Sequence, residues 1–136
     1  MESERHPHFP SGEWEGHYTY GPGSEKHPMA FRLNFAEGSV SGAGSDDVGP
    51  FTWNGHYDTQ SLVVQMVKKY RGAHEVYYDG RADTNGIYGG WRLIFSRGGF
   101  HIWPKALGEE FVTEEVTEEV GAITGADSWS GLLSPR

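Results

Sequence analysis

Residues 28–42 of the chain read PMAFRLNFAEGSVSG, and no other segment indicates a structural class so clearly. Large apolar side chains stand at every second position from 29 to 35, with smaller or polar ones between them. That alternation is typical of a β-strand with one buried face. Glu37-Gly38 then predicts a tight turn into a second strand-like run, residues 39–42. The segment therefore predicts an antiparallel hairpin.

The same pattern continues on both sides of this hairpin, with each segment bounded by Gly, Pro, Asn or Asp. The 20 Gly and 7 Pro residues, with an aromatic fraction of 14%, favour strands and turns over helices. The predicted strands are residues 13–20, 28–36, 39–42, 51–57, 62–70, 74–80, 87–95 and 100–103. Because no connection has the length of a helix, we expect an all-β, eight-stranded, antiparallel up-and-down barrel. A two-sheet sandwich is the alternative, but it needs longer connections.

With 136 residues, the chain has room for one core. Residues 1–11 lack periodicity and are interpreted as a flexible N-terminal segment, and residues 12–104 as the barrel domain. Residues 105–136 are interpreted as an acidic helix candidate and a C-terminal tail. Val112, Val116 and Val120 are spaced as on one helix face, but the glutamates between them repel one another one turn apart. This segment either docks through its valines or frays.

The formal net charge is −8, which disfavours nucleic acid as a partner. The chain has no cysteine and no apolar run of membrane-helix or signal-peptide type, so we expect a soluble, cytoplasmic protein with no membrane partner. The basic run at residues 68–71 is interpreted as a solvated strand end beside a turn.

A five-residue pattern occurs twice: WEGHY at residues 14–18 and WNGHY at residues 53–57. One interpretation is architectural, since glycine between aromatic residues lets a strand coil tightly and lets a neighbouring ring lie over it. The other is functional: the glycines leave space, and aromatic side chains line a ligand cage. The candidate ligand-binding residues are Trp14, Tyr18, Trp53, Tyr57, Tyr78 and Trp91.

No motif indicates catalysis or a cofactor. If the aromatic residues face inward, His17 and His56 face outward, and no two histidines have the close spacing of metal ligands. His6, His8 and His27 lie beside prolines in loop-like sequence and are expected to be solvent exposed. Asp46-Asp47 is interpreted as part of a turn, because the acidic residues of a calcium loop do not follow it. We therefore expect no catalytic residues, no metal and no cofactor.

Two short stretches carry a resemblance to a known group of barrels. Gly12-Glu13-Trp14 in the first strand, followed by residues 37–42, resembles the opening of calycin and avidin/streptavidin-type barrels. The resemblance covers residues 11–104 in architecture and implies an eight-stranded meander around a binding cup. In the lipocalin branch an arginine covers the first-strand tryptophan, which implies Arg92 or Arg97 over Trp14. No set of biotin-contacting residues can be placed, so the resemblance implies no particular ligand.

Three functions remain open from the sequence. The first is a non-enzymatic barrel that binds a small apolar or aromatic ligand. The second is a solid barrel that acts as an interaction or scaffold domain through its surface and its acidic tail, with Trp129 and Leu132-Leu133 among the anchors. The third is a metal-assisted hydrolase. A homodimer is also expected, because six apolar residues are predicted to face outward. They are Val63, Val67, Tyr77, Tyr88, Ile94 and Trp103. Val63/Val67 and Val64/Met66 are nearly equal candidates for the core, and a one-residue slip of the strand exchanges the two pairs.

Overall fold

The computed structural model describes residues 2–105, and eight β-strands account for most of them. The strands are β1 (Gly12–Thr19), β2 (His27–Ala36), β3 (Ser39–Asp46), β4 (Pro50–Tyr57), β5 (Val63–Tyr70), β6 (Glu75–Asp83), β7 (Gly86–Arg92) and β8 (Arg97–Pro104). The acidic helix and tail predicted for residues 105–136 lie outside the described residues, apart from residue 105. Within residues 2–105, no helix is long and apolar enough to cross a membrane.

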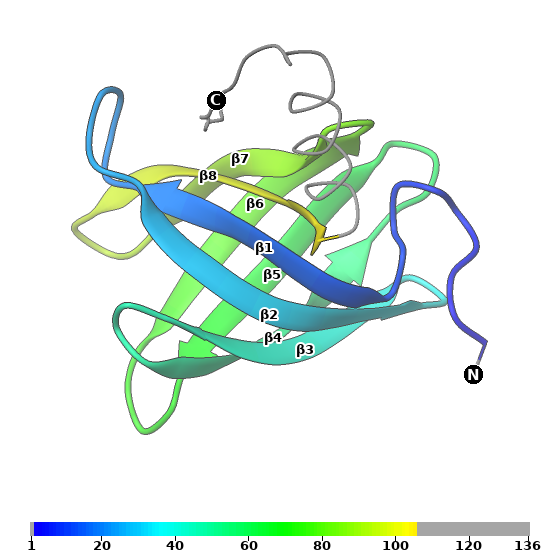
Figure 1. Ribbon diagram of the computed structural model, residues 1–136, viewed down its shortest axis with the longest axis horizontal. Helices are drawn as coiled ribbons and strands as arrows, with labels where there is room; N and C mark the ends of the chain where they lie inside the picture. Colours follow the sequence, from blue (N-terminus) through cyan, green and yellow to red (C-terminus); the bar gives the residue numbers. More distant parts are fainter. Residues whose placement is uncertain (1, 106–136) are drawn as a thin grey trace, which may run out of the picture. The chain divides into compact units, whose positions relative to one another are not determined.

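The strands form a closed antiparallel barrel in sequence order (Figure 1). Each strand pairs with the next, and β1 closes the circle by pairing with β8, from Trp14 opposite Pro104 to Thr19 opposite Gly99. Closure leaves no strand edge unpaired. The eight-stranded up-and-down barrel predicted from the sequence is therefore confirmed, and the alternative sandwich is excluded.

Four strand ends differ from the prediction by more than one residue, those of β3, β6 and β7 and the start of β8. β6 continues to Asp83 instead of residue 80, and β8 begins at Arg97 instead of residue 100. β3 continues to Asp46 instead of ending at residue 42, because its small residues allow a close approach to β2. A Cβ atom on Gly44 would lie 2.5 Å from Phe31 Cα, so only glycine fits there without a backbone shift. β7 stops at Arg92 instead of residue 95, because the Leu93 amide donates to the Ser96 carbonyl and turns the chain into β8.

The interior is filled by the residues at alternate strand positions. Val64 and Met66 face inward and are 1% and 2% exposed, whereas Val63 faces outward. The strand therefore has the register assumed in the sequence analysis, and a one-residue slip is ruled out. The predicted outward-facing apolar residues lie outside the core, but Arg81 separates Val63 from Tyr88 in the ladder, and Arg92 lies over the Tyr77 ring. The homodimer stays a prediction.

The two ends of the barrel differ (Figure 1). One end, here called the loop end, carries the connections at residues 20–26, 47–49, 71–74 and 93–96. The other, the strap end, carries the remaining three turns and the N-terminal residues 2–11, here called the strap. Each strand thus has one terminus at the loop end and the other at the strap end.

The strap contacts the barrel although the sequence indicates a flexible segment. Phe9 is fully buried, and the Glu4 amide donates to the Phe35 carbonyl at 2.8 Å. The indole N–H of Trp14 donates to the Pro10 carbonyl at 2.9 Å. Flexibility itself stays a prediction, but the strap supplies one side chain to the core.

Candidate functional site

The six aromatic residues proposed as a ligand cage are all buried, but they do not form one cage. Trp14 and Tyr57 lie at the strap end, where both contact the Phe35 ring, with centroids 5.7 and 5.2 Å away. The other four lie nearer the loop end. Tyr18, Trp53 and Tyr78 surround the side chain of Lys68, and Trp91 contacts Tyr18 edge to face.

Lys68 points into the barrel, so the interpretation of residues 68–71 as a solvated strand end is wrong for this residue. Its side chain is 1% exposed, and its Nζ lies 2.7 Å from the Asp46 carboxylate and 3.0 Å from the Tyr70 hydroxyl. Five rings lie 4.7–5.7 Å from the ammonium, those of Tyr18, Phe51, Trp53, Tyr70 and Tyr78. The protein's own cation thus occupies an aromatic enclosure of the kind that binds ammonium groups.

Burial and the neighbouring charge have opposite effects on the pKa of Lys68. Desolvation lowers the pKa of Lys68, while the hydrogen bond and the charge of Asp46 raise it. Desolvation and the hydrogen bond to Asp46 both raise the pKa of Tyr70, which keeps its proton for donation. The second oxygen of Asp46 accepts the amide of Val48 at 2.8 Å. One carboxylate therefore joins the interior of the barrel to the β3–β4 turn.

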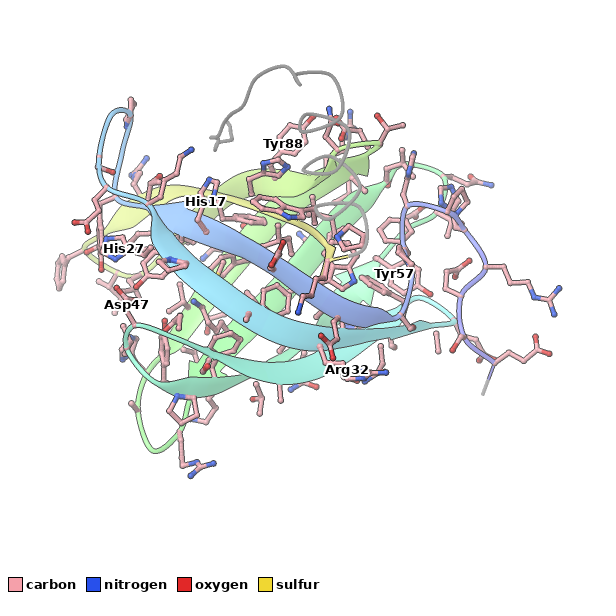
Figure 2. The ribbon with its side chains drawn as sticks, in the orientation of Figure 1. His17, His27, Arg32, Asp47, Tyr57 and Tyr88 are labelled. Atoms are coloured by element: carbon pink, nitrogen blue, oxygen red, sulfur yellow. The ribbon has the colours of Figure 1, made fainter. Side chains whose placement is uncertain are left out.

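A second carboxylate lies beside the first, at the rim of the loop end. Asp47 accepts from the Tyr18 hydroxyl at 2.5 Å and lies 2.6 Å from His27 Nδ1. Figure 2 shows His27 and Asp47 side by side at that end. Desolvation would raise the pKa of Asp47, but the hydrogen bonds from Tyr18 and His27 lower it. His27 is stacked on the Tyr18 ring and is 21% exposed, so the expected solvent exposure is wrong.

Trp53 has an unusual environment. Its side chain is fully buried, and its indole N–H is the one buried side-chain polar atom within residues 2–105 without a hydrogen-bond partner. A buried donor without an acceptor costs about 1–3 kcal/mol. The indole ring is held by its ring contacts, among them the edge-to-face contact with Tyr78 at 4.9 Å, and by the Lys68 ammonium 5.7 Å from its centroid.

At the strap end the Phe9 ring fills a cup, here called the strap cup, formed by Phe35 and Tyr57, with Trp14 in contact with Phe35. Its centroid lies 5.4 Å from that of Phe35 and 4.7 Å from that of Tyr57. The Tyr57 hydroxyl donates to Glu4 of the strap at 2.6 Å. Desolvation and this hydrogen bond raise the pKa of Tyr57 to about 12. Figure 2 shows Tyr57 beside the strap.

This contact predicts a pH dependence. Because the pKa of Tyr57 is about 12 in the folded protein and about 10 in an unfolded chain, its contribution to stability is complete below about pH 10. We expect that contribution to be lost as the pH rises toward 12. Unfolding by urea at several alkaline pH values measures it. The Tyr57→Phe variant should lose less stability over this interval than the wild type, and equal losses would contradict the assignment.

Arg92 and Arg97 do not cover Trp14, so this expectation from the lipocalin resemblance is wrong. Arg92 lies on the outer face, 5.1 Å from the Tyr77 ring and 3.6 Å from Asp79. Arg97 pairs with Arg92 in the β7–β8 ladder, at the loop end, whereas Trp14 pairs with Pro104 at the other end of β8. The two arginines instead flank the β7–β8 hairpin.

A hollow of about 540 Å³ lies along this hairpin. Trp91, Leu93, Ile94 and Phe95 give it an apolar lining, and the polar lining residues include Arg92, Arg97 and Asp79. Ile94 and Phe95, at the hairpin tip, are 89% and 96% exposed. A second hollow, of about 360 Å³, extends over the outer faces of β4 to β6 and shares Asp79 and Arg92 with the first. Trp91 is the one predicted ligand-binding residue that lines either hollow.

The outward-facing histidines form a third cluster. His17 of β1 and His101 of β8 are cross-strand neighbours, and both contact the Trp103 ring. Desolvation, with a smaller effect of Lys26, lowers the pKa of His17 to about 4, so it is neutral at pH 7. No three His, Cys, Asp or Glu side chains within residues 2–105 lie close enough together to hold a metal ion.

Lys68, Asp46 and Phe9 were not predicted as interior residues. A signal existed for Lys68, because Val64, Met66 and Tyr70 mark the inward positions of its strand and Lys68 stands between them. Phe9 carried no such signal, because it stands alone between proline and histidine residues. No protein-family model, no curated protein and no solved structure matches this chain.

Proposed function

We propose that this protein is a non-enzymatic binding barrel that holds a small apolar or aromatic ligand in the hollow along the β7–β8 hairpin. The observation that carries the proposal is the pair of exposed apolar side chains, Ile94 and Phe95, bordering a hollow of about 540 Å³. That volume lies within the range of small-molecule sites, about 300–1,000 Å³. The barrel supplies a rigid wall for it.

The lining residues indicate the ligand's chemistry. Trp91, Leu93 and Phe95 contribute apolar and aromatic surface to the lining. Arg97 makes no ion pair among the described residues, whereas Arg92 has Asp79 at 3.6 Å. An uncompensated arginine beside apolar surface favours a ligand with a negatively charged group. The proposed ligand is therefore an aromatic or apolar anion.

The dye 1-anilinonaphthalene-8-sulfonate tests the site, because it joins an aromatic body to an anionic group. We expect saturable fluorescence enhancement with the wild-type protein. The Ile94→Ser/Phe95→Ser variant should bind the dye about tenfold to a hundredfold more weakly, since burying one such side chain contributes about 1.5–3 kcal/mol. Both changes lie in the exposed tip, so the barrel should stay folded.

The matched control is Val48→Ser, because Val48 is also an exposed apolar residue of the loop end, at 57% exposure, but lies outside the hollow. It should leave dye affinity unchanged. Arg97→Gln should weaken binding most at low salt, because screening already weakens an exposed charge pair at high salt. Equal dye affinity in the wild type and the Ile94/Phe95 variant would exclude this hollow as the site.

A second candidate function is the interaction domain, and the near-complete exposure of Ile94 and Phe95 favours it. Side chains that project so far from a surface suit insertion into a partner, and a second copy of the chain is the partner proposed here. Sedimentation equilibrium should then give twice the 15.1 kDa chain mass, and the Ile94→Ser/Phe95→Ser variant should return the mass to one chain. A wild-type mass of one chain at all concentrations would exclude the homodimer.

A further inference from the structure

The strap end holds a binding arrangement that is independent of the hairpin hollow. Phe9 belongs to no strand, yet its ring is fully buried, while Phe35 and Tyr57 of the strap cup belong to the closed ladder. The walls of the cup therefore come from the barrel, and its content comes from a peripheral segment. The barrel thus forms the binding surface, and the Phe9 ring occupies it.

The strap presents two chemical groups to Tyr57. The Phe9 ring packs against the Tyr57 ring, with centroids 4.7 Å apart, and the Glu4 carboxylate accepts the Tyr57 hydroxyl at 2.6 Å. The strap therefore places an aromatic ring against the Tyr57 ring and a carboxylate against the Tyr57 hydroxyl. A single molecule that carries both groups, joined by a short linker, reproduces this pair of contacts.

Few bonds hold residues 4–9 in place. The Glu4 amide donates to Phe35, and Tyr57 donates to Glu4; the remaining hydrogen bonds of this segment, such as the Phe9 amide to the His6 carbonyl at 3.0 Å, lie within the strap. Opening residues 4–9 breaks no bond of the barrel ladder and leaves the bonds of Pro10 to Trp14 and of Ser11 to Phe35 in place. Segments with so few connections open locally, without global unfolding.

We propose that the strap cup is a second binding site, for an arylalkanoic acid, and that Phe9 and Glu4 occupy it in the free protein. The ring of the ligand replaces the Phe9 ring between Phe35 and Tyr57. Its carboxylate replaces that of Glu4 as the acceptor of the Tyr57 hydroxyl. Binding releases residues 4–9 of the strap from the barrel.

3-Phenylpropionate is the probe, and its binding is measured by titration calorimetry. The Phe9→Ala variant should bind it about tenfold or more tightly than the wild type, because the competing ring is gone and the open cup is more highly populated. In the wild type, saturating probe should speed hydrogen exchange at the Glu4 and Phe9 amides and tryptic cleavage after Arg5. Both readouts follow release of the strap directly.

Two further variants test the contacts. Tyr57→Phe keeps the ring but removes the hydroxyl that donates to Glu4 in the free protein and to the probe's carboxylate in the complex. It should therefore weaken 3-phenylpropionate about tenfold relative to uncharged propylbenzene measured in the same variant. Tyr77→Phe, an exposed tyrosine of the outer face, is the matched control and should change neither. The Ile94→Ser/Phe95→Ser variant should also bind the probe normally, which separates this site from the hairpin hollow.

The proposal is overturned if Phe9→Ala folds but binds neither probe, since the cup would then collapse without its occupant. It is also overturned if the wild type shows no faster strap exchange at probe concentrations that saturate Phe9→Ala, since Phe9 would then be a permanent core residue. If Phe9→Ala does not fold, hydrogen exchange at the Glu4 and Phe9 amides of the wild type decides. Faster exchange with saturating 3-phenylpropionate supports the proposal, and unchanged exchange overturns it.

Discussion

We expect the Lys68→Met variant to have a free energy of unfolding about 3–5 kcal/mol lower than the wild type. The substitution keeps the volume of the side chain, but it removes the ammonium and leaves the buried Asp46 carboxylate without its counter-charge. Breaking a buried ion pair by removing one partner typically has this cost, because an uncompensated charge remains in a medium of low polarity. Urea unfolding followed by tryptophan fluorescence measures the change.

The double variant Lys68→Met/Asp46→Asn provides the internal test. The asparagine oxygen can still accept the amide of Val48, and no charge is left buried. We therefore expect the double variant to be more stable than either single variant, with a coupling energy of about 2 kcal/mol or more. Lys69→Met is the matched control and should change stability by no more than about 0.5 kcal/mol, since Lys69 is exposed. Additive effects of the two single changes would contradict the buried pair.

The second large effect is expected at the centre of the barrel. Trp53→Ala should lower the free energy of unfolding by about 3–5 kcal/mol, because it removes a fully buried indole that packs against Phe31, Phe51 and Tyr78. Calorimetric unfolding measures the loss. A change below about 1 kcal/mol would mean that the surrounding rings close the space, and that Trp53 does not organise the interior.

Two comparisons separate packing from hydrogen bonding at this position. Trp53→Phe should cost only about 1–2 kcal/mol, because the lost contacts are partly offset by removal of an indole N–H that has no acceptor. Trp103→Ala is the matched control on the outer face. Trp103 is partly exposed and its N–H reaches Glu15 at 3.2 Å, so its removal should cost about 1 kcal/mol.

The sequence predicted the barrel because its signal is local. Alternation from residue 29 to residue 35 places β2 within one residue of its observed start, and the short connections exclude crossovers between parallel strands. The end of β7 was placed too late because residues 93–95 are apolar, like a strand. The exposure of Ile94 and Phe95 shows that an apolar run at a hairpin tip cannot be distinguished from a strand by composition alone.

The polar interior was not predictable in the same way. The pattern of β5 places Lys68 at an inward position, but its partner Asp46 lies on β3, which is not a neighbour of β5, and the pair meets across the interior. Such a contact depends on closure of the barrel and on the register of several strands. The same holds for Phe9, because its burial depends on where the strap crosses the end of the barrel, which no periodicity in residues 1–11 encodes.

The proposed ligand site can be located by amide chemical-shift mapping during titration with 1-anilinonaphthalene-8-sulfonate. The hairpin hollow predicts saturable shifts centred on residues 90–98 and on Asp79, the residues that line it. Residues 4–9 of the strap should keep their shifts, because they lie at the opposite end of the barrel. Saturable shifts centred on any other part of the barrel, or shifts that grow without saturation over the whole surface, would contradict the proposed site.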